Sequence, residues 1–229
     1  MTSFSAHGST LRARGVFIAS IHATGDVLLL DEGDEVDDPK DISSLLSKLH
    51  EWQEFHSRYS ANENVDVEAF CWTFTCGRVM EESDLSTGIP QEHVVRVILS
   101  VFAQLSKTIT IHSGLGAVLD TLADEVKDFA TVDQLEAWAR VILLDLRDVI
   151  NERRFLIGSN KTIGMGFREV KVGDEICILL GCSIPVILRQ AKNGHVFISN
   201  AYVDGYMFGK ATLEAEAGSH SWQDFCIHQ

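Results

Sequence analysis

Residues 173–209 constrain the fold of this chain more than any other part of the sequence. Three short apolar runs lie there, at 173–181, 185–189 and 202–209, and they are rich in β-branched or aromatic residues and bounded by Gly, Pro or Asn-Gly. Short runs between such turn residues are typical of tightly connected β-strands, because Gly and Pro break regular structure between them. The sequence therefore predicts several short strands in its C-terminal third.

The rest of the chain carries other patterns. Residues 1–9 suggest a frayed start, and the apolar runs at 15–22 and 27–30, separated by Gly25 and Asp26, predict a strand, a turn and a second strand. Apolar residues then recur every three or four positions, which is typical of one face of a helix. Such stripes predict helices over residues 42–57, 67–80, 94–105, 115–129 and 132–147, and residues 217–229 form a tail that can pack back.

The order of these segments predicts the fold class. A lone hairpin at the N-terminus is marginal in water, and its nearest strand partners lie near the C-terminus. We therefore expect an α+β fold in a single domain, residues 1–229. Residues 11–30 and 153–229 form a small β-barrel or twisted sheet in this prediction, and residues 41–150 form a helical bundle inserted between them.

Charge and composition narrow the function classes. The net charge is −14 and the pI is near 5.0, which disfavours nucleic acid and anionic membrane surfaces as partners. Seven acidic residues against Lys40 lie between positions 31 and 41, a composition typical of a solvated connecting loop. Neither a secretory signal nor a membrane-spanning apolar run is evident, so we expect a cytoplasmic protein.

The familiar cofactor motifs do not occur in the sequence. It lacks a P-loop, a Rossmann glycine fingerprint, a nucleophile elbow and a zincin motif. The five cysteines are spaced unlike a zinc knuckle, which favours buried reduced thiols. We expect no metal ion and no cofactor.

Several short motifs, in a fixed order, carry a family resemblance. The motifs are Arg14-Gly15-Val16 with Gly25-Asp26, residues 68–75, Gly164-Met165-Gly166, Gly173-Asp174, Leu188-Arg189 and Tyr202-Val203 with Gly205, Met207 and Gly209. Over about residues 11–209 the chain resembles the C-terminal region of fungal heterokaryon-incompatibility proteins. The N-terminal signalling domain of that family has no counterpart in the sequence, so we expect the chain to act without it. The resemblance carries over no catalytic or binding residue, and the matched glycines suggest close backbone approach.

The departures from the family pattern often place an aromatic residue where a polar or rigid one is usual. Phe167 stands in place of a proline, and Phe208 lies between the altered positions Asp204 and Lys210. Aromatic residues of this kind would line a pocket for an apolar ligand, although drift in a domain freed from its partner explains them equally well. The predicted substrate-binding residues are Trp72, Phe74, Phe167, Tyr202 and Phe208.

Two functions from different classes fit these observations. The first is a cofactor-independent cyclase of fungal secondary metabolism, which folds an apolar small molecule for an intramolecular cyclisation such as a Diels–Alder (4+2) cycloaddition. Arg189, Tyr206 and Asp204 are its predicted catalytic residues, because hydrogen-bond donors would polarise a substrate carbonyl. The structural alternative for Arg189 is a pair with an acid. The second function is a non-enzymatic regulatory or interaction module that binds a protein partner; the oligomeric state stays open in both.

Overall fold

The computed structural model describes residues 4–7, 10–30, 39–59, 67–77, 146–147, 149–207 and 209–228. The chain divides into two compact units. The β unit comprises Met1–Val27 and Arg153–Gln229, and the insert unit comprises Leu28–Glu152. The mixed α+β class is confirmed. The single-domain organisation with an insertion at 41–150 stays a prediction.

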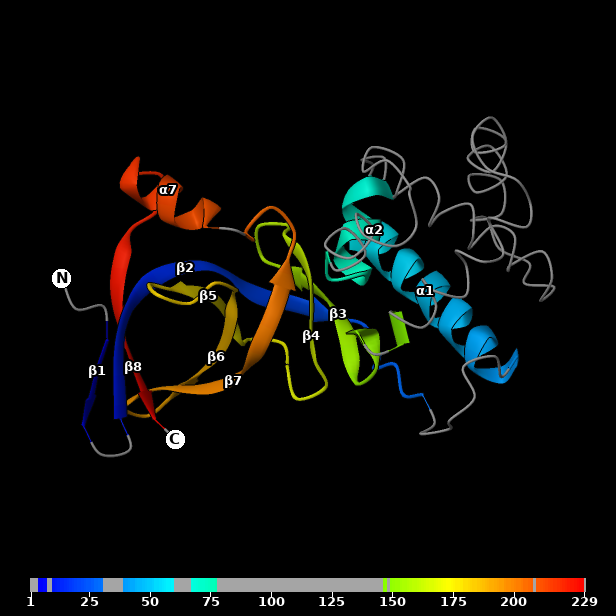
Figure 1. Cartoon of the computed structure of the whole chain (residues 1–229), viewed down its shortest axis with the longest axis horizontal. Helices are drawn as coiled ribbons and strands as arrows, with labels where there is room; N and C mark the ends of the chain where they lie inside the picture. Colours follow the sequence, from blue (N-terminus) through cyan, green and yellow to red (C-terminus); the bar gives the residue numbers. More distant parts are fainter. Residues whose placement is uncertain are drawn as a thin grey trace, which may run out of the picture. The chain divides into compact units, whose positions relative to one another are not determined.

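The β unit holds all the strands of the described residues and one short helix (Figure 1). The elements are β1 Phe4–His7, β2 Thr10–Thr24, β3 Arg153–Gly158, β4 Ile163–Phe167, β5 Glu175–Leu179, β6 Val186–Ala191, β7 Gly194–Val203, α7 Lys210–Glu216 and β8 Trp222–His228. The short strands predicted after residue 153 are therefore confirmed. Helix α7 is a feature that the sequence pattern missed.

The pairing of the strands closes into a ring of hydrogen bonds. β2 pairs with β5 through residues 15–20 and with β3 through residues 21–24, and the path from β3 returns through β4, β7 and β6 to β5. β8 pairs antiparallel with β2 over seven residues and makes a short parallel contact with β7. The prediction that strands from both ends of the chain join in one β body is confirmed.

Strand β2 organises the ring because it pairs with four strands in turn. Its register shifts between Phe17 and Ala19 and again between Ile21 and Ala23. Such irregularities bend a strand and increase its twist, which allows β2 to leave one sheet and enter the next. The strand that the sequence predicts over 15–22 is thus one part of a 15-residue strand.

Two hydrophobic clusters lie on opposite faces of the sheet. Successive side chains of a strand point to opposite faces. On β5, Ile176 and Ile178 therefore join one cluster with Leu156 and Val203, whereas Cys177 joins the other. The second cluster also contains Leu179, Leu188, Phe225 and Ile227.

The Gly-x-Gly motif on β4 has a steric explanation. A Cβ atom on Gly164 would lie 2.6 Å from the backbone oxygen of Tyr202, and one on Gly166 would lie 2.8 Å from a methyl carbon of Leu156. Both distances are shorter than real Cβ contacts. Gly164 requires glycine because the backbone of Tyr202 cannot give way, whereas at Gly166 the Leu156 side chain would have to shift. The predicted close approach is confirmed at this motif.

Two expectations for the N-terminal residues were wrong. Phe4–His7 form β1, which pairs with β2, in place of a fully frayed start. Residues 27–30 do not form a strand. Their backbone groups bond instead to the segment before β3, since the Leu28 oxygen accepts from the Glu152 N–H at 2.9 Å and the Leu30 N–H donates to Asn151 Oδ1 at 3.0 Å.

The described part of the insert unit confirms two predicted helices. Helix α1, Pro39–Tyr59, buries Leu45, Leu49 and Trp52 on one face. Helix α2, Val67–Phe74, ends before the predicted residue 80, because Cys76 and Gly77 adopt φ values of 52° and 70° that no helix continues. The helices predicted at 94–105 and 115–129, and nearly all of that at 132–147, fall outside the described residues. No described helix has the length and apolar character needed to cross a membrane.

Candidate functional site

Arg189, a predicted catalytic residue, is bound to a buried carboxylate. Its Nε and Nη2 atoms donate to the two oxygens of Asp174 at 2.7 and 2.9 Å, and the Asp174 side chain is only 2% exposed. The hydrogen bonds to Asp174 raise the pKa of Arg189 above its ordinary value. The structural alternative, that Arg189 pairs with an acid, is therefore confirmed.

The same arginine holds the loop between β4 and β5. Arg189 Nη2 donates to the backbone oxygen of Glu169 at 2.9 Å, and Arg154 Nη1 donates to the backbone oxygen of Val170 at 3.0 Å. The Lys171 N–H donates to Asp174 Oδ2 at 2.8 Å, which closes a turn within the loop. Residues 169–174 are thus fixed against β6 by a bidentate ion pair and backbone contacts.

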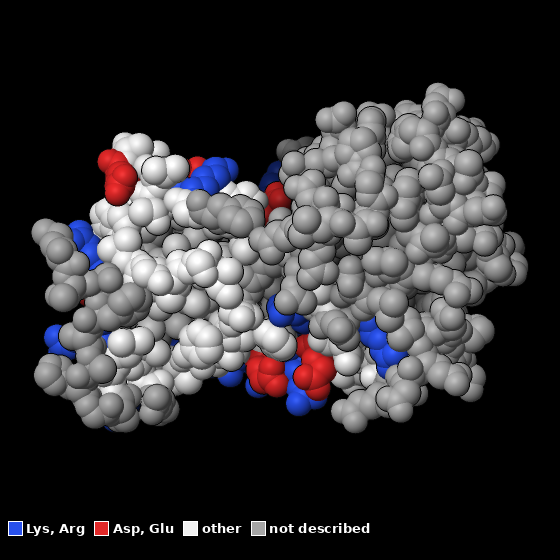
Figure 2. All heavy atoms as spheres, viewed as in Figure 1, with Lys and Arg blue, Asp and Glu red and all other residues white. Residues whose placement is uncertain are grey.

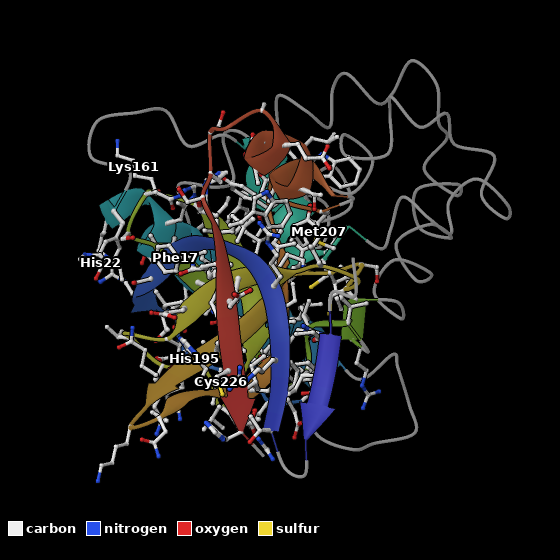
Figure 3. The ribbon with its side chains drawn as sticks, turned by 90° about the vertical axis from the view of Figure 1, so that its left-hand side faces the viewer. Phe17, His22, Lys161, His195, Met207 and Cys226 are labelled. Carbon is white, nitrogen blue, oxygen red and sulfur yellow. The ribbon has the colours of Figure 1, made fainter. Side chains whose placement is uncertain are left out.

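A second polar cluster lies on the other face of β5 and β6. Gln190 Nε2 donates to Glu175 Oε1 at 2.6 Å, and His195 Nε2 lies 3.0 Å from Glu175 Oε2. The His195 ring also meets the Phe225 ring at 5.4 Å in an edge contact. Figure 3 labels His195 close to Cys226 of β8, consistent with the pairing of β7 and β8. His195 Nδ1 is buried and has no hydrogen-bond partner.

The sequence analysis missed Glu175, Gln190 and His195. A signal was present, because Asp174 and Glu175 are adjacent, and so are Arg189 and Gln190. Neighbouring residues on a strand point to opposite faces, so an acid–polar pair on each face follows once these two segments are aligned. That alignment, Glu175 opposite Leu188, comes only from the structure.

The cysteines of the chain are free thiols. Burial, with a smaller contribution from the charge of Glu175, raises the pKa of Cys177 well above its ordinary range. Burial also raises the pKa of Cys182. Within the described segments, no group of three or more His, Cys, Asp or Glu side chains could hold a metal ion.

Tyr206 and Asp204, the other predicted catalytic residues, follow the end of β7. Tyr206 packs against the first hydrophobic cluster, its ring lies 6.2 Å from the His220 ring, and Lys210 Nζ lies 5.5 Å from the centre of its ring. Burial, followed by the charge of Glu214, raises the pKa of Tyr206. Asp204 is half-buried and its N–H donates to the Ile163 oxygen at 3.0 Å.

The predicted substrate-binding residues fall in several places. Tyr202 lies on β7 opposite Met165, and the ring of Phe167 on β4 carries the Arg153 guanidinium 4.1 Å above it. Phe208 lies outside the described residues. Trp72 and Phe74 belong to the insert unit, where Phe74 is 2% exposed and contacts the Phe70 ring at 5.5 Å. Their role as substrate-binding residues stays a prediction.

Comparison with known families decides the relationship. Residues 108–221 match the model of the Het-6 β-barrel domain, a domain associated with heterokaryon incompatibility. The chain contains a Het-6 β-barrel domain. The resemblance drawn from the short motifs is thereby confirmed. No curated protein and no solved structure matches the chain significantly.

The match to the Het-6 domain covers β3 to β7 and α7, but it stops before β8 and does not include β2. β2 is a member of the hydrogen-bonded ring, and β8 pairs with β2 and β7 outside the ring. His228 links the end of β8 to its neighbours. Its Nε2 donates to the backbone oxygen of Asn193 at 2.9 Å, and its Nδ1 lies 3.2 Å from Thr10 Oγ1. The strands inside the matched residues thus pair with strands that lie outside them.

Proposed function

We propose that this chain is a non-enzymatic interaction module of the heterokaryon-incompatibility type, with a small β-barrel as its binding body. The observation that carries the proposal is the surface around Arg189. The Arg189 guanidinium is committed to Asp174, while Val172 in the loop that it holds and Val196 directly across the β6–β7 hairpin are exposed at 63% and 36%. Two exposed valines and a fixed arginine provide apolar surface that a protein partner can bury and a rigid polar group beside it.

The bound state of Arg189 supports binding over catalysis. Donors that stabilise developing charge must point at the reacting atom and not at a protein carboxylate. Two nitrogens of Arg189 instead donate to Asp174, and Nη2 also donates to the backbone oxygen of Glu169. A fixed arginine of this kind positions a loop and presents a rigid surface, which lowers the entropy cost of docking.

Site-specific photo-crosslinking tests the interaction module. A photoreactive amino acid replaces Val196 in one sample and Leu213 in a matched control, since Leu213 is 66% exposed on α7. In extract of the organism that makes the chain, we expect a discrete protein adduct from position 196 and none from position 213. Equal adducts from both positions, or none from 196, would contradict the proposal.

A second candidate, the cofactor-independent cyclase, is favoured by Tyr206. Its ring packs against the first hydrophobic cluster, and its hydroxyl is protonated near neutral pH, as the ordinary phenol pKa of about 10 already requires. A protonated phenol next to apolar surface could donate a hydrogen bond to a substrate carbonyl as a diene and an activated alkene combine. Asp204 stays a proposed catalytic residue in this reading, whereas the guanidinium of Arg189 is bound to Asp174.

Product analysis tests the cyclase. The purified chain is incubated with linear polyenes that bear an enal or enone, and cyclised products are measured by mass spectrometry with their diastereomer ratio. We expect Tyr206→Phe to return the ratio to that of the uncatalysed reaction, and Tyr59→Phe in α1 to change nothing. Unchanged rates and ratios with the native chain would remove this candidate.

A further inference from the structure

The two units carry very different charges. The β unit contains ten Lys and Arg against eight Asp and Glu, a net charge of +2. The insert unit contains nine Lys and Arg against twenty-five Asp and Glu, a net charge of −16. The acidity of the chain therefore comes from the insert unit alone, and the β unit is weakly basic.

Within the β unit, acidic side chains are absent from the β6–β7 hairpin and its approach. Residues 176–203 contain no Asp or Glu, whereas Arg189, Lys192 and His195 occur there. The two acids just before this stretch, Asp174 and Glu175, are 2% and 9% exposed and are both bound by hairpin residues. The hairpin thus has no exposed negative charge of its own.

The hairpin and the loop that Arg189 holds carry exposed apolar and cationic residues. Val196 pairs directly with Arg189, so the two side chains share a face. Arg189 also holds the loop that carries Lys171 and Val172, both exposed. Among the described residues, neither Lys171 nor Lys192 takes part in an ion pair. In the view of Figure 2, Lys and Arg appear as separate patches within a mostly uncharged described surface.

We propose that the surface of this hairpin and loop, defined by Lys171, Val172, Arg189, Lys192 and Val196, binds an acidic protein segment that also carries apolar side chains. The inference rests on the proposed interaction module and names the chemistry of its partner. The two exposed valines provide apolar contact, and the two unpaired lysines complement acidic side chains at the rim. Because Val172 and Val196 are exposed, a partner that also offers apolar side chains would bury more surface than a purely charged one.

Nucleic acid is a disfavoured partner for the same surface. Binding to a phosphate backbone commonly neutralises six to ten phosphates with Lys and Arg, as a rough measure. This surface offers two unpaired lysines, and Arg168, in the same loop as Lys171, is paired with Glu169 at 3.0 Å. An acidic peptide needs far fewer charges, since apolar contacts supply part of its affinity.

A defined peptide library tests the inference. Peptides of alternating Asp or Glu with Leu, Val or Phe are compared with two controls, one with Lys in place of the acids and one with Ser in place of the apolar residues. Fluorescence anisotropy with the full chain measures the affinities at low and high salt. We expect binding of the acidic apolar peptides only, weakening as salt rises.

Matched charge reversals localise the contact. The double variant Lys171→Glu with Lys192→Glu should weaken the acidic apolar peptides roughly tenfold. The control double variant Lys161→Glu with Lys210→Glu changes the net charge equally at exposed positions elsewhere and should leave the affinity near that of the native chain. Phe197→Ser alters the opposite face of the hairpin and should also have little effect.

Several results would overturn the inference. The first two are an equal loss of peptide affinity in both double variants and equal binding of the Ser control peptides. The next two are tighter binding of RNA or phosphatidylserine vesicles, and a salt-sensitive dimer abolished by Lys171→Glu with Lys192→Glu. The last is that no library peptide binds. If position 196 still crosslinks to a protein in that last case, the interaction module stands and only the acidic chemistry fails. Without that adduct, both fail.

Discussion

Two consecutive acidic residues, Asp174 and Glu175, are both buried yet are used in different ways on the two faces of β5. Asp174 receives two charged hydrogen bonds from Arg189 and one backbone N–H from Lys171. Glu175 receives the Gln190 amide and contacts the ring of His195. The first carboxylate is paired with a permanent cation, whereas the second relies on a neutral amide and an imidazole.

The difference teaches that burial alone does not define a functional carboxylate. A guanidinium stays charged at any accessible pH, so the Asp174 side acts as a permanent cross-link that shapes a surface. The Glu175 side leaves His195 Nδ1 buried without a partner, which is a weaker arrangement of the same strand segment. The predictions below separate the two faces by their response to mutation.

The largest expected effect comes from Arg189→Leu. It leaves Asp174, 2% exposed, without its counter-charge. Removing one partner of a fully buried pair costs about 3 kcal/mol or more, and because the Arg189 side chain is 37% exposed we expect a loss of about 2–3 kcal/mol. Hydrogen exchange of the β5 and β6 amides measures the loss in the β unit. The control Arg168→Leu, at an exposed pair with Glu169, should change stability by less than about 0.5 kcal/mol. A loss below about 1 kcal/mol for Arg189→Leu would show that Asp174 is solvated or otherwise paired.

The two acids themselves should differ by a smaller amount. Asp174→Asn weakens bonds to a charged donor and should cost about 2 kcal/mol, whereas Glu175→Gln alters bonds to an amide and an imidazole and should cost about 1 kcal/mol. Both variants keep the side-chain size, so hydrogen exchange compares them directly. The reverse order would mean that the His195 side carries the stronger interaction.

Thiol chemistry probes the Glu175 face. Cys177 lies on that face, and burial is the main cause of its raised pKa, ahead of the charge of Glu175. Native Cys177 should therefore react with iodoacetamide at least about tenfold more slowly than half-exposed Cys226. Glu175→Gln should hardly change the rate, because burial remains. A large acceleration would identify the charge of Glu175 as the main cause.

The smallest effect extends the comparison to a surface acid. Glu214 contacts His220 at 3.1 Å and, after burial, contributes to the raised pKa of Tyr206. Because the folded state favours the neutral phenol, the stabilisation is complete below the ordinary phenol pKa of about 10 and is lost as pH rises through the folded value. Alkaline absorbance titration should show Tyr206 ionising after an exposed tyrosine, and Tyr206→Phe should remove the late step. A Tyr206 that titrates with an ordinary pKa would place its hydroxyl in water.

Part of the candidate site was accessible from the sequence. Arg189 stood out as a strand-end arginine, and its alternative of pairing with an acid was correct. The sequence did not identify that acid, because Asp174 and Arg189 come together only through the pairing of β5 with β6. The cluster of Glu175 and His195 depends on a further pairing, of β6 with β7, and residue patterns alone could not align three strands.

The sequence by itself determined the α+β class, helix α1, the short C-terminal strands and the heterokaryon-incompatibility relationship. These features follow from local periodicity, turn residues and the order of short motifs, all of which act over a few neighbouring positions. The tertiary structure alone decided that β2 ends at Thr24 and residues 27–30 form no strand, that α7 covers one hydrophobic cluster, and that β8 pairs with β2 and β7. The Thr10–His228 contact joins residues 218 positions apart. Pairings at that separation are selected by the collective packing of two hydrophobic clusters, which no local pattern encodes.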